Sequence, residues 1–399
     1  MTASLRSVSC FSAMLVFGGS VALGFGAGCG DDGTGGAGGG GPAESGTVEV
    51  QISGEELATD GFDFPTGSEV TFVDGWAITF DHVFVTVGRA WLSDNPDVSP
   101  SDQSQTGADV AELVGPWAVD VARDGDRPGV GGEGTAHLLG VIEDRNLNDG
   151  ASFDSDRRYA FSFSFVPASA DAAPIGFADD PDALAAYDEA VAGGYSVYYV
   201  GTATFQGGST CESADPAYDF EAVPKTVRFK LGFDTPVHYR NCQNENNDGD
   251  PLPDEEFQRG ISILTNQASV AQITVHIEHP FYSAVQHEPP IYFDQFAARL
   301  VGAADDAVLT TEALAGVDPT GFEDVSGANL PWRSCDGSPL PAGTDRAFDV
   351  GSIPVGPAQD PSDGFRDYLD YVRYVQSTQG HMNGGEGLCF IDRQYPSPR

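Results

Sequence analysis

The chain has 399 residues, of which 60 are acidic and 19 are basic, and its formal net charge is −41. This excess of negative charge makes nucleic acids and anionic lipid headgroups poor partners for the folded part of the chain. It suits a salty exterior or cation binding, although solubility alone also accounts for it.

The N-terminal segment 1–28 is typical of a secretory signal peptide. It holds one charged residue, Arg6, followed by an apolar run over 11–25. This run is too short and too rich in glycine to span a bilayer permanently. We therefore expect that the chain is exported and that this segment is removed.

A cysteine, Cys29, ends the sequence Gly26-Ala27-Gly28-Cys29 that follows the apolar run. The four residues resemble the lipobox of bacterial lipoproteins, in which the cysteine receives lipid after cleavage, except that Gly26 stands where leucine is usual. Residues 30–46 are nearly all glycine, alanine, aspartate and serine, which is typical of a flexible tether. We expect lipidation at Cys29 and a tether over 29–46, with cleavage and release as the alternative.

Short apolar stretches alternate with Gly, Pro, Asp and Ser over 48–272, which predicts a series of strands. The stretch 159–166 places four aromatic residues on one face and small residues on the other. Half-buried strands of this kind belong to an antiparallel sheet that packs on one side, as in a β-sandwich. The expected strands are 48–52, 76–91, 118–121, 137–142, 159–166, 195–205, 226–234 and 269–275.

Helices are expected to be few and to lie mostly in the C-terminal half. The segment 182–192 ends at two glycines, 290–303 begins at a Pro-Pro pair, and 365–375 has apolar residues at helical spacing. The predicted fold class is therefore mainly β (α+β), an antiparallel sandwich-like core with a few appended helices. We expect one globular domain over 47–399, with a possible internal boundary near 207–217.

Four cysteines remain once the signal peptide is removed and Cys29 carries lipid. An even number of cysteines in an exported chain predicts two disulfides. Three connectivities are possible. We favour Cys211 with Cys242 and Cys335 with Cys389, because each pair is close in sequence.

Three of the seven histidines fall within the sequence HIEHPFYSAVQH, which begins at His276. The preceding SVAQITV predicts a strand, on which His276 and Glu278 would share one face while His279 would lie on the other. Further candidate ligands are His287 in the following loop, Asp294 in the predicted helix and His381 in a glycine-rich turn. Imidazole and carboxylate groups suit zinc, copper or iron. The sequence therefore predicts a transition-metal site held by His276, Glu278 and His287, with His279, Asp294 and His381 as further candidate ligands.

A structural role is the alternative for this cluster. In that interpretation His276 and Glu278 pair with a neighbouring strand, and His287 caps the entry to the helix. His82, which lies in a predicted strand and shares a face with Phe80 and Phe84, is interpreted as a core histidine.

A second candidate site is the loop 244–255. Its Asn, Asp, Gly and Glu residues have the spacing of an EF-hand calcium loop. Pro251 and Pro253 break the flanking elements that an EF-hand needs, and such loops are also common turns without an ion. A similar cluster over 144–156 fits the spacing less well. The candidate calcium ligands are Asn244, Asn246, Asp248, Asp250 and Glu255.

Motifs of the common hydrolase, nucleotide-binding and zinc-ribbon classes are missing. The signal peptide, Cys29, the tether and the acidic β-rich body resemble uncharacterised cell-envelope lipoproteins of Gram-negative bacteria. This resemblance implies attachment to a membrane through a lipid anchor. It also implies sorting to the outer membrane, because Gly30 rather than aspartate follows Cys29, but it implies no activity.

The leading hypothesis is thus a non-enzymatic, lipid-anchored binding protein that holds a transition metal. A calcium-stabilised surface interaction or adhesion module is one alternative, and a metal-dependent hydrolase or oxygenase is another. The sequence points to no particular protein or small-molecule partner.

Overall fold

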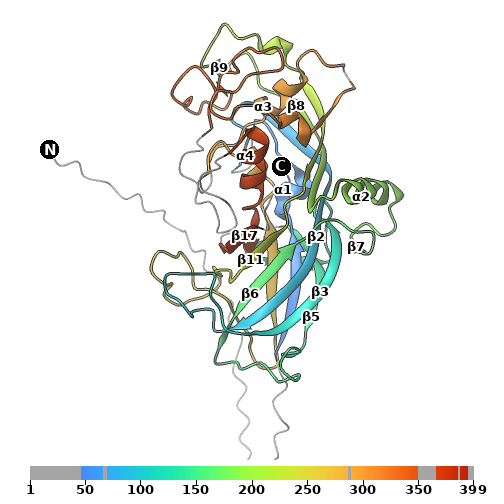
Figure 1. Ribbon diagram of the computed structural model, residues 1–399, viewed down its shortest axis with the longest axis vertical. Coiled ribbons are helices and arrows are strands. Elements are labelled where there is room, and N and C mark those ends of the chain that lie inside the picture. Colours follow the sequence, from blue (N-terminus) through green and yellow to red (C-terminus); the bar gives the residue numbers. More distant parts are fainter. Residues whose placement is uncertain are drawn as a thin grey trace, which may run out of the picture. The chain divides into compact units, whose positions relative to one another are not determined.

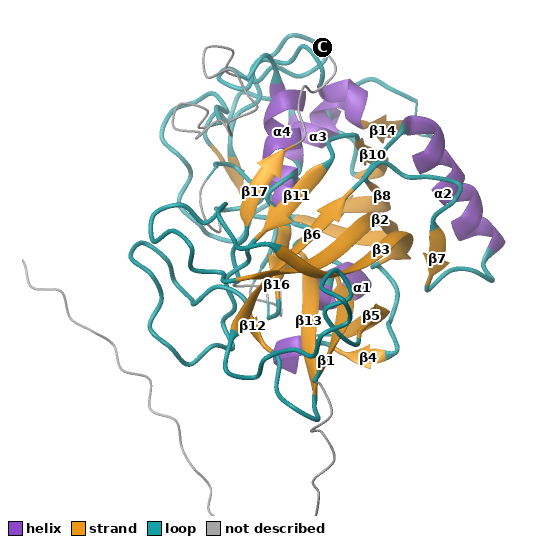
Figure 2. Cartoon of the chain, turned by 60° about the horizontal axis from the view of Figure 1, so that its bottom comes forward, coloured by secondary structure: helices purple, strands orange, loops and turns teal. Residues whose placement is uncertain are grey.

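A five-stranded and a ten-stranded β-sheet dominate the fold of the computed structural model (Figures 1 and 2). It describes residues 46–65, 70–132, 134–285, 289–304, 306–348, 365–384 and 387–393. The signal peptide, the tether, Cys29 and His287 lie outside these residues, so their predictions stay untested. Residues 43–399 group into one unit, with no division near 207–217.

The smaller sheet is built around the first strand, β1 (Thr47–Ser53). β1 pairs in parallel with β13 (Ala268–Val275) and antiparallel with β5 (Thr135–Ile142). β16 (Gly380–Met382) pairs with the outer side of β13, and β4 (Arg127–Pro128) pairs with β5. Segments that lie far apart in the sequence therefore meet at the β13–β16 edge.

The larger sheet is organised by the long strand β2 (Trp76–Asp94). β2 pairs antiparallel with β3 (Asp109–Asp120), β6 (Arg158–Phe165) and β8 (Val197–Phe205). The other strands of this sheet are β7 (Ala173–Ile175), β10 (Thr226–Phe233), β11 (Val237–Arg240), β12 (Ile261–Ser262), β14 (Val308–Thr310) and β17 (Phe390–Arg393). A separate small sheet pairs β9 (Glu212–Ser213) with β15 (Arg333–Ser334).

The mainly β fold class is confirmed, but the sheets are mixed rather than purely antiparallel. β1 with β13, β10 with β14 and β3 with β7 are parallel pairs. Parallel neighbours require a long connection between the two strands, which local alternation in a sequence does not reveal.

Apolar side chains from both sheets form one core, including Val50 of β1 and Phe163 of β6. The strand β6 differs from its half-buried prediction, because its small-residue face is also covered. Ser162 is 2% exposed, and its hydroxyl accepts a hydrogen bond from the amide of Asn241 at 2.9 Å. A loop after β11 therefore closes over this face and satisfies the hydroxyl.

Two of the three predicted helices are confirmed. α2 (Pro181–Gly193) ends where Gly194 adopts a left-handed φ of 66°, and α4 (Tyr368–Gln376) follows the predicted apolar spacing. α1 (Glu55–Asp60) was not predicted, and with α2 it places two of the α-helices in the described residues before the midpoint of the chain. The 3₁₀ helices are η1 (Val130–Gly132), η2 (Phe220–Ala222), η3 (His279–Phe281), η4 (Ala298–Leu300) and η5 (Thr311–Leu314).

The helix predicted over 290–303 is wrong. Only α3 (Asp294–Ala297) and the 3₁₀ turn η4 form there. The chain before α3 is extended, since Ile291 bridges both Phe72 and Tyr282. Among the described residues, no helix is long and apolar enough to cross a membrane.

Candidate metal centre

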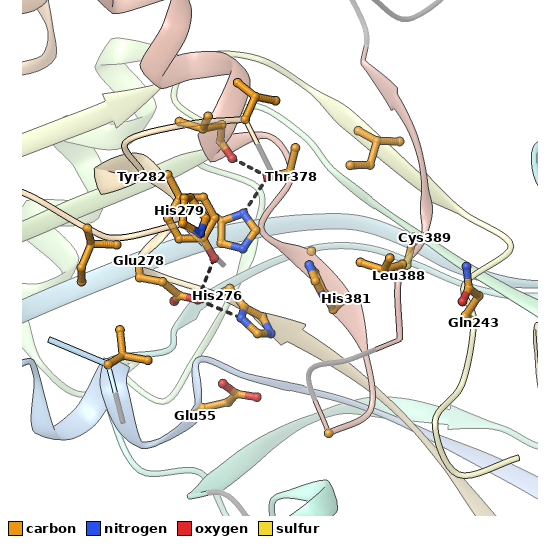
Figure 3. Close-up of a pocket in the computed structure, with 18 of the residues that line it drawn as sticks. Glu55, Gln243, His276, Glu278, His279, Tyr282, Thr378, His381, Leu388 and Cys389 are labelled. Carbon is orange, nitrogen blue, oxygen red and sulfur yellow. Dashed lines mark hydrogen bonds and ion pairs between the residues drawn. The ribbon is translucent and has the colours of Figure 1, made fainter. Parts of the chain in front are cut away.

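The histidines of the segment 276–279 lie where β13 ends (Figure 3). The strand stops at Val275, one residue before His276, and η3 begins at His279. The prediction that His276 and Glu278 share a strand face is therefore wrong, because both lie in the turn between β13 and η3. The same turn brings His279 to their side rather than to the opposite face.

Ligating atoms of His276, Glu278 and His279 lie within 4.8 Å of one another. His381, in the middle of β16, joins them: its ring centre lies 4.4 Å from that of His276 and 5.7 Å from that of His279. Glu278, His279 and His381 are buried, and His276 is half-buried. The group of His276, Glu278 and His279 could hold a metal ion.

Hydrogen bonds to protein groups hold one ring nitrogen of each imidazole. Thr378 Oγ1 lies 2.6 Å from His279 Nδ1, and this hydroxyl also donates to the carbonyl oxygen of Val375 at 2.7 Å. His276 Nδ1 lies 2.9 Å from Glu278 Oε1. Nδ1 of both imidazoles therefore has a protein partner, and Nε2 is the other nitrogen that could ligate a metal. Carboxylate and hydroxyl partners on the far nitrogen are typical of metal-bound histidine.

Glu278 is an anion at neutral pH. Burial raises the pKa of this carboxyl, but in the metal-free protein at acid pH the charge and hydrogen bond of protonated His276, with the charge of protonated His279, outweigh burial and lower the pKa to about 2. The Tyr282 hydroxyl also lies 3.4 Å from Glu278 Oε1. An ionised Glu278 can orient His276 or bind a cation directly.

We expect this carboxylate to make the metal-free protein sensitive to acid. Because the pKa is depressed from 4.5 to about 2, its stabilisation is complete above pH 4.5 and is lost as the pH falls towards 2. The loss amounts to about 3 kcal/mol, at ~1.4 kcal/mol per pH unit. Urea unfolding between pH 5 and 2 should show a shallower fall in stability for Glu278→Gln than for the wild type. Equal slopes would contradict the ion pair.

The cluster lies on the wall of a large pocket (Figure 3). The pocket has a volume of about 1440 Å³ and is lined by His276, Glu278, His279 and His381, together with residues of α1 and of the loop before β17. Pockets of ~300–1,000 Å³ already suffice for drug-sized ligands. The pocket therefore has room for a drug-sized molecule beside a metal bound at this wall.

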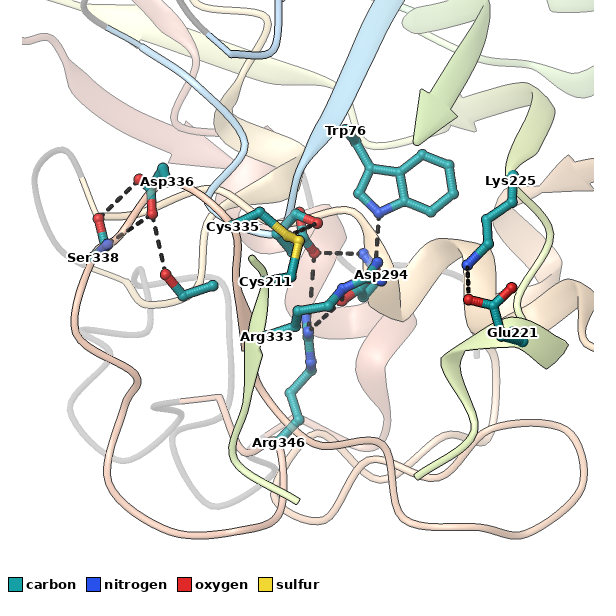
Figure 4. Close-up of a disulfide and its surroundings, with 12 residues drawn as sticks. Trp76, Cys211, Glu221, Lys225, Asp294, Arg333, Cys335, Asp336, Ser338 and Arg346 are labelled. Carbon is teal, nitrogen blue, oxygen red and sulfur yellow. Dashed lines mark hydrogen bonds and ion pairs between the residues drawn. A yellow bond between two sulfur atoms is a disulfide. The ribbon is translucent and has the colours of Figure 1, made fainter. Parts of the chain in front are cut away.

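Asp294, another predicted ligand, does not belong to this group (Figure 4). Its carboxylate accepts hydrogen bonds from Trp76 Nε1 at 2.9 Å and from Arg333 Nε at 3.0 Å, and Arg346 Nη2 lies 3.4 Å away. The prediction is wrong because the extended chain before α3 carries Asp294 to the start of β2. There two buried guanidinium groups neutralise it.

Asp74 belongs to the same buried network. Its carboxylate accepts the amides of Phe293 at 2.9 Å and Asp294 at 2.7 Å. Burial and the neighbouring Asp294 carboxylate raise the pKa of Asp74 to about 8, against the opposing charges of Arg346 and Arg333. Such a shift often marks a functional group, but Asp74 is fully buried and does not line the pocket, so we assign it a structural role.

The loop 244–255, predicted to bind calcium, makes internal hydrogen bonds. Asn244 Oδ1 accepts from the amide of Asn246 at 3.1 Å and from Asn383 Nδ2 at 2.9 Å. Glu255 Oε1 binds Arg259 Nε at 2.6 Å. Two of the five predicted ligands thus bind protein groups, and calcium binding here stays a prediction.

The described residues contain two disulfides, as predicted, but with a different connectivity. The bonds are Cys211–Cys335, drawn in Figure 4, and Cys242–Cys389. The preference for neighbours in sequence was wrong because strand pairing brings distant segments together. Cys211 and Cys335 flank the paired strands β9 and β15, and Cys242 and Cys389 flank β11 and β17.

Loss of the Cys242–Cys389 bond should destabilise the protein strongly. The bond joins residues 147 apart, and loop-closure entropy alone predicts about 5 kcal/mol for a loop of this length. Urea unfolding of the Cys242→Ser, Cys389→Ser double variant should show a loss approaching this value. Non-reducing peptide mapping of the wild type should recover Cys242 linked to Cys389. A peptide linking Cys211 to Cys242 would contradict the structure.

Two residues that shape the centre were not predicted from the sequence. The Thr378 hydroxyl lies 2.6 Å from His279 Nδ1, and the Tyr282 ring packs on His279 with ring centres 4.4 Å apart. Tyr282 follows His279 by three residues, so a helical turn at Pro280 would have revealed it. Thr378 lies 99 residues from His279, and no local pattern signals that contact.

Comparison of the chain with family models, curated proteins and solved structures finds no match. A function for this chain therefore has to be argued from the site itself.

Proposed function

We propose that this chain is an exported, lipid-anchored binding protein that holds one transition-metal ion through His276, Glu278 and His279. The observation that carries the proposal is the approach of their ligating atoms to within 4.8 Å of one another. Two imidazoles and one carboxylate suit zinc, iron or copper and leave coordination positions open. His381 is the next candidate ligand, because its ring centre lies 4.4 Å from that of His276.

The partners of the two imidazoles favour a metal over a purely structural polar cluster. Thr378 and Glu278 each contact the Nδ1 atom of one imidazole, that of His279 and that of His276. A polar partner that orients each ligand from behind is typical of metal sites. A structural cluster needs only that each imidazole is hydrogen-bonded.

Elemental analysis of protein purified without a histidine tag tests the proposal. We expect about one zinc, copper or iron per chain in the wild type and none in His279→Ala. His82→Ala is the matched control, because His82 binds Asp120 at 2.8 Å, on the larger sheet, and should leave the metal content unchanged. Calcium as the only metal would favour the calcium-stabilised interaction module instead.

A metal-dependent hydrolase or oxygenase is the second candidate, and the pocket is the observation that favours it. A pocket of about 1440 Å³ gives a substrate access to open positions on the metal. Metal-loaded wild type that hydrolyses a chromogenic ester or consumes dioxygen, with the activity lost in His279→Ala, would support this function over simple binding.

The lipid anchor makes a separate prediction. Cys29→Ala should move the protein from the membrane fraction to the soluble fraction of the cell envelope, because a single lipidated cysteine is the expected attachment. Detergent partitioning and immunoblotting of fractions measure this. Unchanged membrane association of Cys29→Ala would refute lipidation as the means of attachment.

A further inference from the structure

The pocket at the candidate metal centre is strongly acidic. Its described lining residues include a single guanidinium group, that of Arg259, which already binds Glu255 at 2.6 Å. The carboxylates among its described lining residues are those of Glu55, Glu56, Asp254, Glu255, Glu278 and Asp336. A divalent metal at the histidines would neutralise only part of this charge. The pocket therefore attracts cations and repels anions.

The same pocket also has apolar walls. Leu57, Val70 and Val285 line it half-buried, and Ile291 and Val375 line it buried. Apolar walls with a few polar groups are typical of sites for organic molecules rather than for hydrated ions alone. The ligand that fits best thus combines a positive charge with a carbon skeleton.

One carboxylate of the pocket, that of Glu55, is placed by a strained backbone. Glu55 opens α1 with a φ of 59°, in the left-handed region that residues with a β-carbon avoid. Its amide donates to Ser53 Oγ at 2.9 Å, and Ser53 Oγ donates to the carbonyl oxygen of Thr135 at 3.0 Å. Gly54, just before it, is packed so closely that a β-carbon would lie 2.5 Å from that of Ala58. The hydrogen bond to Ser53 and the close packing of Gly54 therefore hold the backbone that leads into Glu55.

Figure 3 draws Glu55 below the His276–Glu278 pair, on the wall of the same pocket. Strained conformations persist where the surrounding structure enforces them, and they gather at ligand-binding sites. Glycine would adopt this φ without strain. An acidic side chain suits the first turn of α1, but the strained φ is a cost that glycine would avoid, and the position of Glu55 on the pocket wall gives a reason to keep the side chain.

We propose that the pocket binds an organic amine whose ammonium group lies against Glu55, while a neutral nitrogen of the same ligand completes the coordination of the metal. The second contact rests on the proposed metal centre, whereas the contact with Glu55 does not. A neutral donor fits because an anionic one would meet the repulsion of the carboxylate walls. Glu55 is thus the residue that determines specificity for the cationic end.

Histamine and imidazole-4-acetate test the proposal, because they share the imidazole donor and carry opposite charges. In calorimetric titrations of zinc-loaded wild type, we expect histamine to bind at least tenfold more tightly. Glu55→Gln should weaken histamine by about fivefold, which corresponds to a half-exposed ion pair, and should not weaken imidazole-4-acetate. Asp60→Asn, an exposed change on the same helix outside the pocket lining, is the matched control and should change neither affinity.

Glu55→Gly separates binding from folding. Because glycine relieves the strain, its melting temperature should equal or exceed that of the wild type, while its affinity for histamine falls. A lower melting temperature would assign Glu55 a structural role and overturn the proposal. Equal affinities for the two probes with one zinc per chain would also overturn it, and would leave the metal centre standing. Tight, Glu55-dependent binding of spermidine to protein that elemental analysis shows to hold no metal as purified would support the amine contact at Glu55, while the elemental analysis itself would refute the metal centre.

Discussion

Replacing Asp294 by alanine should lower the free energy of unfolding by about 3 to 5 kcal/mol, the usual cost of removing one partner from a buried ion pair. Asp294 is fully buried, and it accepts hydrogen bonds from Trp76 and Arg333 and lies 3.4 Å from Arg346. The alanine variant leaves two guanidinium groups without this anion in the interior. Chemical denaturation with two independent spectroscopic probes measures the loss.

Two further variants make this result specific. Asp188→Ala removes an exposed carboxylate from α2 and should change stability by no more than about 0.5 kcal/mol. Asp294→Asn keeps the volume but not the charge, so it should also destabilise. Metal content should be unchanged in every Asp294 variant that folds. Wild-type stability of Asp294→Ala would contradict the buried network, and loss of metal from folded Asp294→Asn would return Asp294 to the list of ligands.

The strands were the part of the fold that the sequence predicted best. Alternation of aromatic and small residues located β6, and a left-handed Gly194 ends α2 as expected. Both features are set by residues that are neighbours in the sequence, so the sequence pattern predicts them directly. The parallel partners of β1 and β10 depend on long connections, and no local pattern encodes them.

In the candidate metal centre, too, the sequence predicted what depends on neighbouring residues and not what depends on distant segments. His276, Glu278 and His279 are neighbours in sequence, so their clustering was predictable, although the turn that gathers them was mistaken for a strand. The contribution of His381 follows from the register of β16 on β13, where it lies opposite Thr274. Asp294 was predicted as a ligand because it is close to the histidines in sequence. This was wrong, because the extended chain before α3 carries it away from them. Contacts between segments that lie far apart in the sequence decide both positions, and the sequence pattern does not predict such contacts.

A chelator should lower the melting temperature of the wild type and leave that of His276→Ala unchanged. A bound ion stabilises the native state by mass action, by about 2.7 kcal/mol when free metal is a hundredfold above its dissociation constant. His276 supplies one of the three ligating groups, so its removal should abolish most of that stabilisation. Differential scanning calorimetry with and without chelator measures the shift within each variant, which cancels any direct effect of the substitution on folding.

The metal affinity should also depend on pH. Imidazoles bind a metal in their neutral form, so affinity should fall as the pH drops through the ordinary titration range of histidine, near about 6.5. Binding therefore releases protons, which titration calorimetry in buffers of different ionisation enthalpy detects. His82→Ala should keep both the chelator effect and the proton release, because His82 binds Asp120 rather than the cluster. If the wild type melts identically with and without chelator and carries no stoichiometric metal, the four side chains form a structural polar cluster, and the proposed metal-binding function falls with the site.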